Sequence, residues 1–126
     1  MQHLPWERVK REALNDKLSR RVVHGEKITL ARLELAQGCT VPAHQHENEQ
    51  ITMVHAGVLK FSLGGQEVVA RAGEVLVIPP NVPHNVTALE DSVAFDVFSP
   101  IRSDWIQGKD SYLRKCAGTT PVRPRS

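Results

Sequence analysis

Four side chains that bind metal ions well lie in two short stretches of the sequence. His44 and His46 are two residues apart, Gln50 follows four residues later, and His84 ends the segment GEVLVIPPNVPH. Three imidazole nitrogens and one amide oxygen are good ligands for Zn, Ni, Fe, Mn or Cu, and they leave open positions for substrate or water. A single histidine is more often an ordinary surface or core residue. The combined spacing, however, favours a metal site.

The alternation of side chains along an extended segment decides which of these residues can converge. We expect Gln50 to share the face of His44 and His46, whereas the residues between them face the other way. This argument makes His55 a weaker candidate ligand. It also turns the competing carboxylate of Glu49 away from the face that Gln50 uses.

An acid and an aromatic ring share one face of a later apolar segment, SVAFDVF. Asp96 and Phe98 are two residues apart, so Asp96 would line a partly dry pocket near the metal site if this face points inward. The alternative is an outward-facing aspartate, because an unpaired buried carboxylate is costly. The residues alone leave both possibilities open.

Short apolar runs rich in Val, Ile, Leu and Thr fill residues 19–100, and Gly, Pro and Asn interrupt them at frequent intervals. This pattern is typical of antiparallel strands in a sandwich or barrel. Gly64 and Gly65 predict a tight hairpin, because glycine takes a positive φ without steric cost. Arg32 and Glu34 share one side of the segment ITLARLEL, which the sequence assigns neither to the interior nor to solvent.

Two segments lie outside this block. Residues 1–18 place Trp6, Val9, Ala13 and Leu14 near helical spacing but offer no strong cap, so they predict a short helix or an extended arm. Residues 101–126 form a C-terminal extension that begins with an expected helical turn around SDWIQ. It ends in GTTPVRPRS, whose composition predicts disorder from about residue 117.

Composition limits the class of protein. The chain of 126 residues has the size of one domain, and its 16 Lys and Arg against 14 Asp and Glu leave a net charge of +2. Because the basic residues are spread along the chain, nucleic acid is not an expected partner. No apolar run is long enough to cross a bilayer and no secretory signal is visible, so we expect a cytoplasmic protein without a membrane partner. Cys39 and Cys116 form no CxxC motif and are expected to be ordinary thiols.

The segment GCTVPAHQHENEQITMVHAG resembles the first cupin motif, and GEVLVIPPNVPH resembles the second. The fifteen residues between Gly57 and Gly73 are close to the short spacing of compact microbial cupins. The resemblance covers roughly residues 19–100 and implies an all-β cupin fold, a jelly-roll barrel of antiparallel strands. It also implies one divalent transition metal ion per chain, Zn, Ni, Fe or Mn, bound by His44, His46, Gln50 and His84.

Two positions depart from the cupin pattern. Asn81 stands where the second motif usually has glycine, and asparagine is the other residue that accepts the left-handed region most readily. Gln50 stands where most cupins have a glutamate ligand. A neutral amide leaves the charge of the ion uncompensated, which strengthens it as a Lewis acid and disfavours higher oxidation states. This favours polarising or anion-binding chemistry over reactions with dioxygen.

The stretch ALEDSVAFDVFSPIRSDW resembles the C-terminal segment of the pectin-degradation cupins, the KdgF family. These cupins open 4,5-unsaturated uronate monosaccharides to linear keto acids, a non-oxidative isomerisation. The resemblance implies Asp96 as general acid/base, Phe98 as a wall that stacks on the sugar, and Arg102 as a clamp for the uronate carboxylate. The alternative for Arg102 is a solvated residue on the rim.

Two other functions stay open at this point. Three histidines also suffice for an iron or copper dioxygenase of a small organic substrate, and a cupin can bind a sugar acid without converting it. Because small cupins usually pair, the resemblance also implies a homodimer. The residues expected at its apolar two-fold interface are Trp6, Ile51, Met53 and His55.

Overall fold

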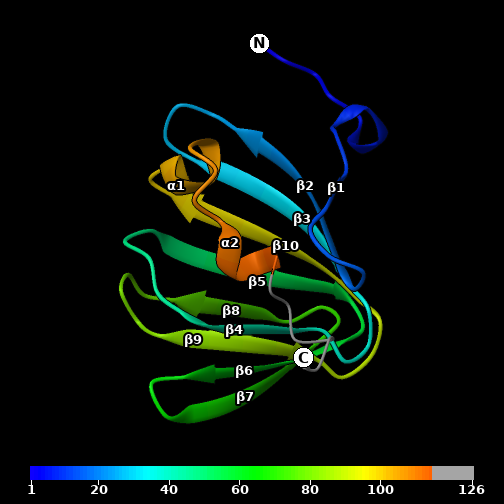
Figure 1. Ribbon diagram of the computed structural model, residues 1–126, viewed down its shortest axis with the longest axis vertical. Helices are drawn as coiled ribbons and strands as arrows, with labels where there is room; N and C mark the ends of the chain where they lie inside the picture. The colour runs from blue at the N-terminus through cyan, green and yellow to red at the C-terminus, as the bar shows by residue number, and fades with distance from the viewer. Residues whose placement is uncertain (115–126) are drawn as a thin grey trace, which may run out of the picture.

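Two antiparallel sheets face each other across one hydrophobic core in the computed structural model, which describes residues 1–114 (Figure 1). The larger sheet has six strands in the order β1 (Glu12–Ala13), β2 (Leu18–His24), β3 (Thr29–Leu35), β10 (Ser92–Ser99), β5 (Glu49–Ala56) and β8 (Val75–Ile78). The smaller sheet has four, in the order β4 (Thr40–His44), β9 (His84–Ala88), β6 (Val58–Leu63) and β7 (Gln66–Arg71). This architecture confirms the expected all-β jelly-roll barrel.

Alternation along the central strands decides which residues line the interior. In β5, Gln50 and Thr52 are buried while Ile51 and Met53 are exposed, as the sequence pattern predicts. In β10, the side chain of Asp96 points inward and is only 9% exposed, so the outward alternative for this aspartate is wrong. The face of β5 that carries Gln50 and the face of β10 that carries Asp96 therefore both point into the interior of the barrel.

Three turns depend on backbone geometry that few residues accept. Gly64 and Gly65 have φ angles of 51° and 88° in the connection between β6 and β7, which confirms the predicted hairpin. Gly57, between β5 and β6, has a φ of 86° and lies so close to Ser92 that an added Cβ would clash with the Ser92 hydroxyl oxygen. Asn81 has a φ of 61°, in the left-handed region expected for it.

Strand β3 settles the orientation of two charged residues. Arg32 and Glu34 alternate with buried positions and therefore lie on the outer side of the larger sheet. Their side chains pair there, with 3.0 Å between Arg32 Nη1 and Glu34 Oε2. Neither residue lines the interior of the barrel.

The N-terminal segment is an extended arm with one turn of 3-10 helix, η1 (Trp6–Arg8). The Trp6 ring lies 5.9 Å from the ring of Phe95, on the outer side of the larger sheet. The guanidinium of Arg21 donates to the backbone carbonyls of Trp6 at 2.8 Å and Val9 at 2.9 Å, which fastens the arm to β2. Among residues 1–114, no helix is long and apolar enough to span a membrane.

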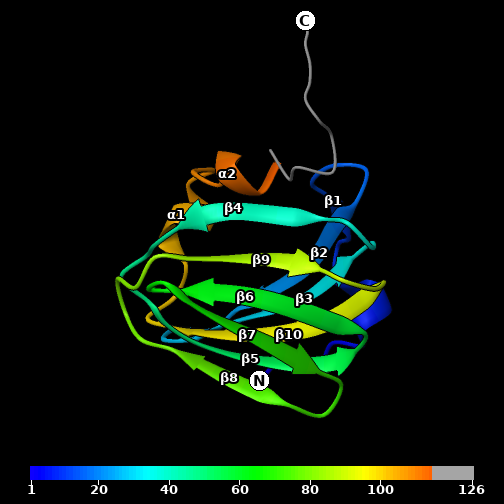
Figure 2. The same ribbon diagram turned by 90° about the horizontal axis from the view of Figure 1, so that it is seen from below.

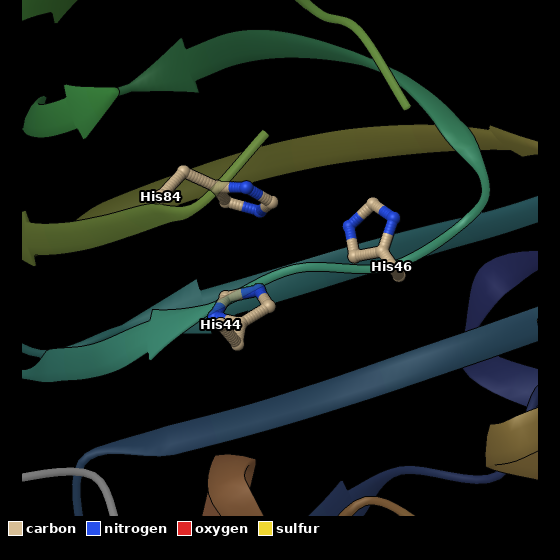
Figure 3. A group of neighbouring side chains, drawn as sticks. All are labelled: His44, His46 and His84. Atoms are coloured by element: carbon tan, nitrogen blue, oxygen red, sulfur yellow. The ribbon is translucent and has the colours of Figure 1, made fainter. Parts of the chain in front are cut away.

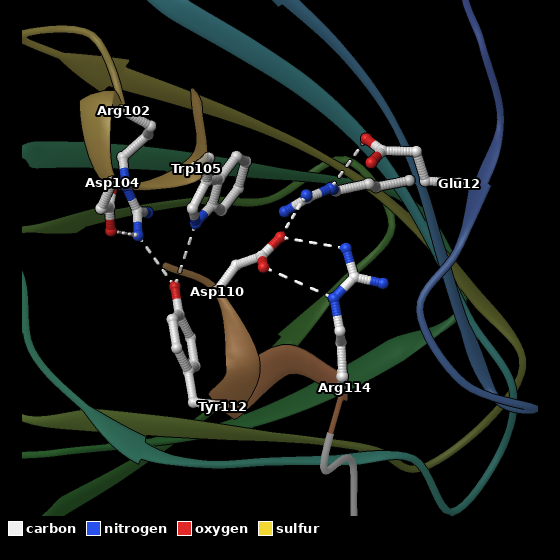
Figure 4. A network of polar contacts seen from close by, with 8 residues as sticks. Glu12, Arg102, Asp104, Trp105, Asp110, Tyr112 and Arg114 are labelled. Carbon is white, nitrogen blue, oxygen red and sulfur yellow. Dashed lines mark hydrogen bonds and ion pairs between the residues drawn. The ribbon is translucent and has the colours of Figure 1, made fainter. Parts of the chain in front are cut away.

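Two short helices follow β10, α1 (Ser103–Ile106) and α2 (Ser111–Arg114), and α1 confirms the expected helical turn around SDWIQ. Figure 2 shows α2 beside β4. Ion pairs fasten this segment to the barrel, because Asp110 pairs with buried Arg20 of β2 and with Arg114, while Glu12 also pairs with Arg20 (Figure 4).

Cys39, the one cysteine among residues 1–114, differs in its bonding from the sequence-based expectation. Cys39 is wholly buried and disulfide-bonded. The prediction that it is an ordinary thiol is therefore wrong. Cys116 and the stretch predicted to be disordered from about residue 117 lie outside the described residues.

Candidate metal centre

Three histidines converge at one end of the barrel, near the ends of two paired strands (Figure 3). His44 is the last residue of β4 and lies opposite His84, the first residue of β9, in the strand ladder. His46 follows in the turn after β4. One ligand nitrogen from each residue lies within 4.8 Å of the others, a separation that one shared metal ion can bridge.

Backbone carbonyls fix the orientation of all three imidazole rings. A carbonyl oxygen can only accept a hydrogen bond, so each Nδ1 carries the proton and each Nε2 keeps its lone pair. The three Nδ1 contacts are His44 with Pro42 O at 2.8 Å, His46 with Asn48 O at 3.0 Å, and His84 with Val82 O at 2.8 Å. This arrangement presents the Nε2 atoms as metal ligands.

The same histidines are held in their neutral, ligating form. Burial lowers the pKa of His44 and of His46 to about 4, and it lowers the pKa of His84 as well. Neighbouring cationic groups, with Arg102 among them, act in the same direction. All three imidazoles are therefore unprotonated at Nε2 near neutral pH.

Two observations test whether a metal ion fits these residues. Among residues 1–114, His84 Nε2 is one of two buried side-chain nitrogen or oxygen atoms without a hydrogen-bond partner. Gln50 Oε1 lies 3.0 Å from His46 Nε2, and in the tautomer described above both atoms are acceptors. A cation shared by these lone pairs would satisfy both, so the donor set of His44, His46, His84 and Gln50 fits a divalent transition metal.

A cavity of about 60 Å³ extends from this centre into the barrel. Asp96 and Phe98 of β10 line it together with His44, Gln50 and His84. Burial raises the pKa of the Asp96 carboxyl to about 6, although a hydrogen bond from Thr52 and the charge of Arg102 oppose this shift. A carboxyl group with such a pKa can both accept and return a proton near neutral pH.

Arg102 lies in the wall of the same cavity and is only 1% exposed, so the alternative of a solvated rim residue is wrong. Its Nε and Nη2 atoms donate to the two carboxylate oxygens of Asp104 at 3.0 and 2.9 Å, and Nη2 also donates to the Tyr112 hydroxyl at 2.8 Å (Figure 4). The guanidinium carbon lies 4.6 Å from the centre of the Phe98 ring and 4.3 Å from that of Trp105. These contacts hold the charge of Arg102 beside the metal centre.

Sequence reasoning placed Arg102 in the site but missed two aromatic residues of the same C-terminal segment. Trp105 and Tyr112 both line the cavity, and the ring of Tyr112 lies 4.5 Å from that of His44. Asn48 was missed as well, although its amide nitrogen donates to the carbonyls of Pro100 and Ile101. The only signal in the sequence was that the chain's one tyrosine and a tryptophan follow the last strand closely.

Comparison with solved structures finds the same fold in several cupins. KdgF from a Halomonas species superposes with a TM-score of 0.74 at 27% sequence identity, over 79% of this chain and 94% of that one. An RmlC-like cupin from Shewanella frigidimarina gives a TM-score of 0.77 at 23% identity, over 83% and 96% of the two chains. The oxalate decarboxylase of Bacillus subtilis, described with Mn(II) centres, gives 0.69 at 16% identity over 77% of this chain and 29% of that chain.

The sequence comparisons give the family. A search of curated proteins finds no significant match. The cupin domain model matches residues 31–98, which include His44, His46, Gln50 and His84. This match covers more than half of the chain, and the chain therefore belongs to the cupin family.

Proposed function

We propose that this cupin is a metal-dependent, non-oxidative enzyme that opens 4,5-unsaturated uronate monosaccharides to linear keto acids. The observation that carries the proposal is that an acid with a raised pKa, a buried guanidinium and the metal-binding residues line one cavity. These are Asp96, Arg102, His44, Gln50 and His84. The resemblance of the segment around Asp96 to the KdgF family and the structural similarity to KdgF support it.

The substrate binds through its carboxylate in this proposal. Asp104 and Tyr112 occupy the Nε and Nη2 atoms of Arg102, so Nη1 is the atom offered to the uronate carboxylate. A hydrogen bond between two ionised groups is stronger than a neutral one, and its strength increases further in a site that excludes water. Phe98 packs beneath the guanidinium and forms an apolar wall beside the sugar.

Asp96 moves the proton. Thr52 donates to Asp96 Oδ1 at 2.7 Å, so Oδ2 is the oxygen proposed to react. The carboxylate takes the proton of the anomeric hydroxyl, and the bond from C1 to the ring oxygen breaks, which leaves an aldehyde and an enolate. The same proton then goes to C4 of the enolate and gives the keto acid. A bound divalent metal would supply the positive charge that stabilises the enolate oxygen.

This reaction needs no oxidant, because it moves one proton and removes no electrons from the substrate. This separates the proposal from a dioxygenase, the first alternative. The neutral amide of Gln50 in the ligand set agrees with a Lewis-acid role, since it does not compensate the charge of the ion. The second alternative, a cupin that binds a sugar acid without converting it, would use the same Arg102 contact but show no turnover.

The size of the cavity imposes a further condition. Its volume of about 60 Å³ is well below the roughly 300–1,000 Å³ of typical small-molecule sites. Substrate entry therefore requires that the side chains covering the cavity shift. Trp105 and Tyr112, from the two short helices, are among the side chains that line the cavity, and we propose that they move.

The test is an assay of the metal-loaded protein on 4,5-unsaturated galacturonate, in which the loss of the conjugated-alkene absorbance is followed under argon and in air. We expect equal acceleration over the spontaneous reaction in both atmospheres, and none after chelation of the metal. Acceleration only in air, with oxygen uptake, would instead indicate a dioxygenase. Tight binding of the uronate without any acceleration would indicate the non-catalytic alternative.

The Arg102 contact has its own matched control in the same assay. Arg102→Lys keeps the positive charge but loses the planar fork, so KM for the uronate is expected to rise about tenfold, which corresponds to about 1.4 kcal/mol. Arg32→Lys makes the same change on the outer side of β3 and should leave KM unaltered. Equal KM values for the two variants would remove Arg102 from substrate binding.

A further inference from the structure

A chain of three polar side chains, linked by two buried hydrogen bonds, leads from the metal centre into the core of the larger sheet. Gln50 Oε1 faces His46 Nε2 at 3.0 Å, and Gln50 Nε2 donates to the Thr52 hydroxyl oxygen at 2.8 Å. The Thr52 hydroxyl in turn donates to Asp96 Oδ1 at 2.7 Å. Gln50, Thr52 and Asp96 are exposed by only 5%, 2% and 9%. Because these three side chains are buried, water cannot readily replace a hydrogen-bond partner that a substitution removes.

The direction of each hydrogen bond follows from the chemistry of Asp96. An ionised carboxylate can only accept, so the single hydroxyl hydrogen of Thr52 is committed to Asp96. The Thr52 oxygen is then left as an acceptor and takes an N–H of the Gln50 amide. The carbonyl end of that amide must consequently point the other way, toward His46 and the metal centre (Figure 3 shows His46).

We propose that Thr52 is a positioning residue whose hydroxyl, oriented by Asp96, sets the carbonyl end of Gln50 toward the metal ion. With the amide reversed, N–H groups without lone pairs would face the metal and Gln50 would no longer be a ligand. A glutamate in the same place needs no such control, because both ends of a carboxylate are oxygens. The requirement for Thr52 is thus a consequence of the amide. This inference rests on the metal centre of the proposed function, and it is independent of the substrate.

The first test measures the affinity of purified variants for Zn(II), by competition with a chromophoric chelator and without any uronate. Thr52→Val keeps the β-branched shape but removes the hydroxyl, so we expect zinc affinity to fall about 10- to 100-fold, the range seen when groups that orient metal ligands are removed. Thr52→Ser restores the hydroxyl and should return affinity to within about threefold of the wild type. Thr87→Val is the matched control, because the partly buried Thr87 hydroxyl pairs with Thr40 in the smaller sheet.

The second test asks whether the effect passes through the amide. In a Gln50→Glu background, Thr52→Val should no longer weaken zinc affinity by more than about threefold, since either carboxylate oxygen can ligate. An equal loss of affinity in both backgrounds would show that Thr52 does not act by orienting Gln50, and would overturn the proposal.

A variant at the Asp96 end of this hydrogen-bond chain provides a second test in case Thr52→Val does not fold. The Asp96→Asn amide can donate to the Thr52 oxygen, which releases the Thr52 hydroxyl toward Gln50 and favours the reversed amide. It should weaken zinc affinity in the same way, and a folded Asp96→Asn protein with wild-type zinc affinity would count against the proposal. Thr52-dependent zinc binding without uronate turnover would disprove only the proposed function.

Discussion

The ring of Tyr112 lies with its centre 4.5 Å from the ring of the metal-site residue His44, although 67 positions separate them in the sequence. Tyr112 belongs to α2, which ion pairs between Asp110, Arg20 and Arg114 hold against the barrel. The Tyr112 hydroxyl accepts hydrogen bonds from Arg102 Nη2 at 2.8 Å and from Trp105 Nε1 at 3.3 Å. The segment after the last strand therefore completes the cavity and orients the arginine beside the metal centre.

Removal of the Tyr112 hydroxyl tests this orienting role. Tyr112→Phe keeps the ring against His44 but deprives Arg102 Nη2 of an acceptor, and a hydrogen bond to a charged group contributes about 1.5–3 kcal/mol. We expect kcat/KM on 4,5-unsaturated galacturonate to fall at least about tenfold, while zinc affinity stays unchanged because His44 keeps its ring contact. Steady-state kinetics and zinc titration of the same preparation separate the two quantities. Wild-type kcat/KM would show that the hydroxyl does not position Arg102.

Metal removal should lower the thermal stability of the protein. A ligand that binds only the folded state stabilises it by about 2.7 kcal/mol at a free concentration of 100 times its Kd. For a domain of this size that corresponds to a Tm increase on the order of 10 °C, which calorimetry with and without a chelator will measure. His44→Ala should abolish the difference between the two scans. His55→Ala, on the exposed outer side of β5, should preserve it.

The outer side of the larger sheet carries an apolar surface that suits self-association. Its members in β5, β8 and β10 are 37–60% exposed, namely Ile51, Met53, Val75, Val77 and Val97. The sequence predicted outward positions for Ile51 and Met53, which the structure confirms, while the homodimer stays a prediction. We expect a dimer mass in light scattering at micromolar concentration, and a monomer for Met53→Lys, because a charge in a two-fold contact meets its own copy. Val69→Lys alters an exposed valine of β7 instead and should remain dimeric.

The convergence of the candidate metal ligands could be predicted in part because alternation and motif spacing are local properties of a sequence. His44, His46 and Gln50 lie within seven residues, so the face that they share follows from the extended backbone. The pairing of His44 with His84 is a matter of strand register between β4 and β9, which needed the resemblance to known cupins. The inward orientation of Asp96 stayed open, because whether a carboxylate can be buried depends on partners such as Thr52 and Arg102 from elsewhere in the chain.

Arg102, Trp105 and Tyr112 were harder to place for a physical reason. They follow the last strand, where the period-2 pattern ends, and the helices that carry them have only four residues each. Such short helices have little stability of their own, so their position depends on tertiary contacts. Asp110 and Arg20, which contact each other, are 90 residues apart in the sequence, and no local sequence pattern predicts this contact.

The raised pKa of Asp96 predicts how the stability of the metal-free protein depends on pH. The folded-state pKa is about 6 against an ordinary value of 3.8, so the folded state binds the proton more tightly than the unfolded chain. The stabilising effect of this proton is complete below about pH 4 and is lost as the pH rises through about 6. A shift of about two units corresponds to about 3 kcal/mol.

Asp96→Asn isolates this contribution from that of the histidines. The pKa values of His44 and His46 are lowered to about 4, so these residues destabilise the folded state as the pH falls below about 6.5, the opposite sign. Both metal-free proteins share this histidine effect, and it cancels in their difference. We therefore expect the free energy of unfolding of Asp96→Asn, relative to that of the wild type, to be about 2.5 kcal/mol lower at pH 4 than at pH 7. Urea unfolding of the two chelator-treated proteins at both pH values measures this difference, and a value independent of pH would show that Asp96 does not titrate in this range.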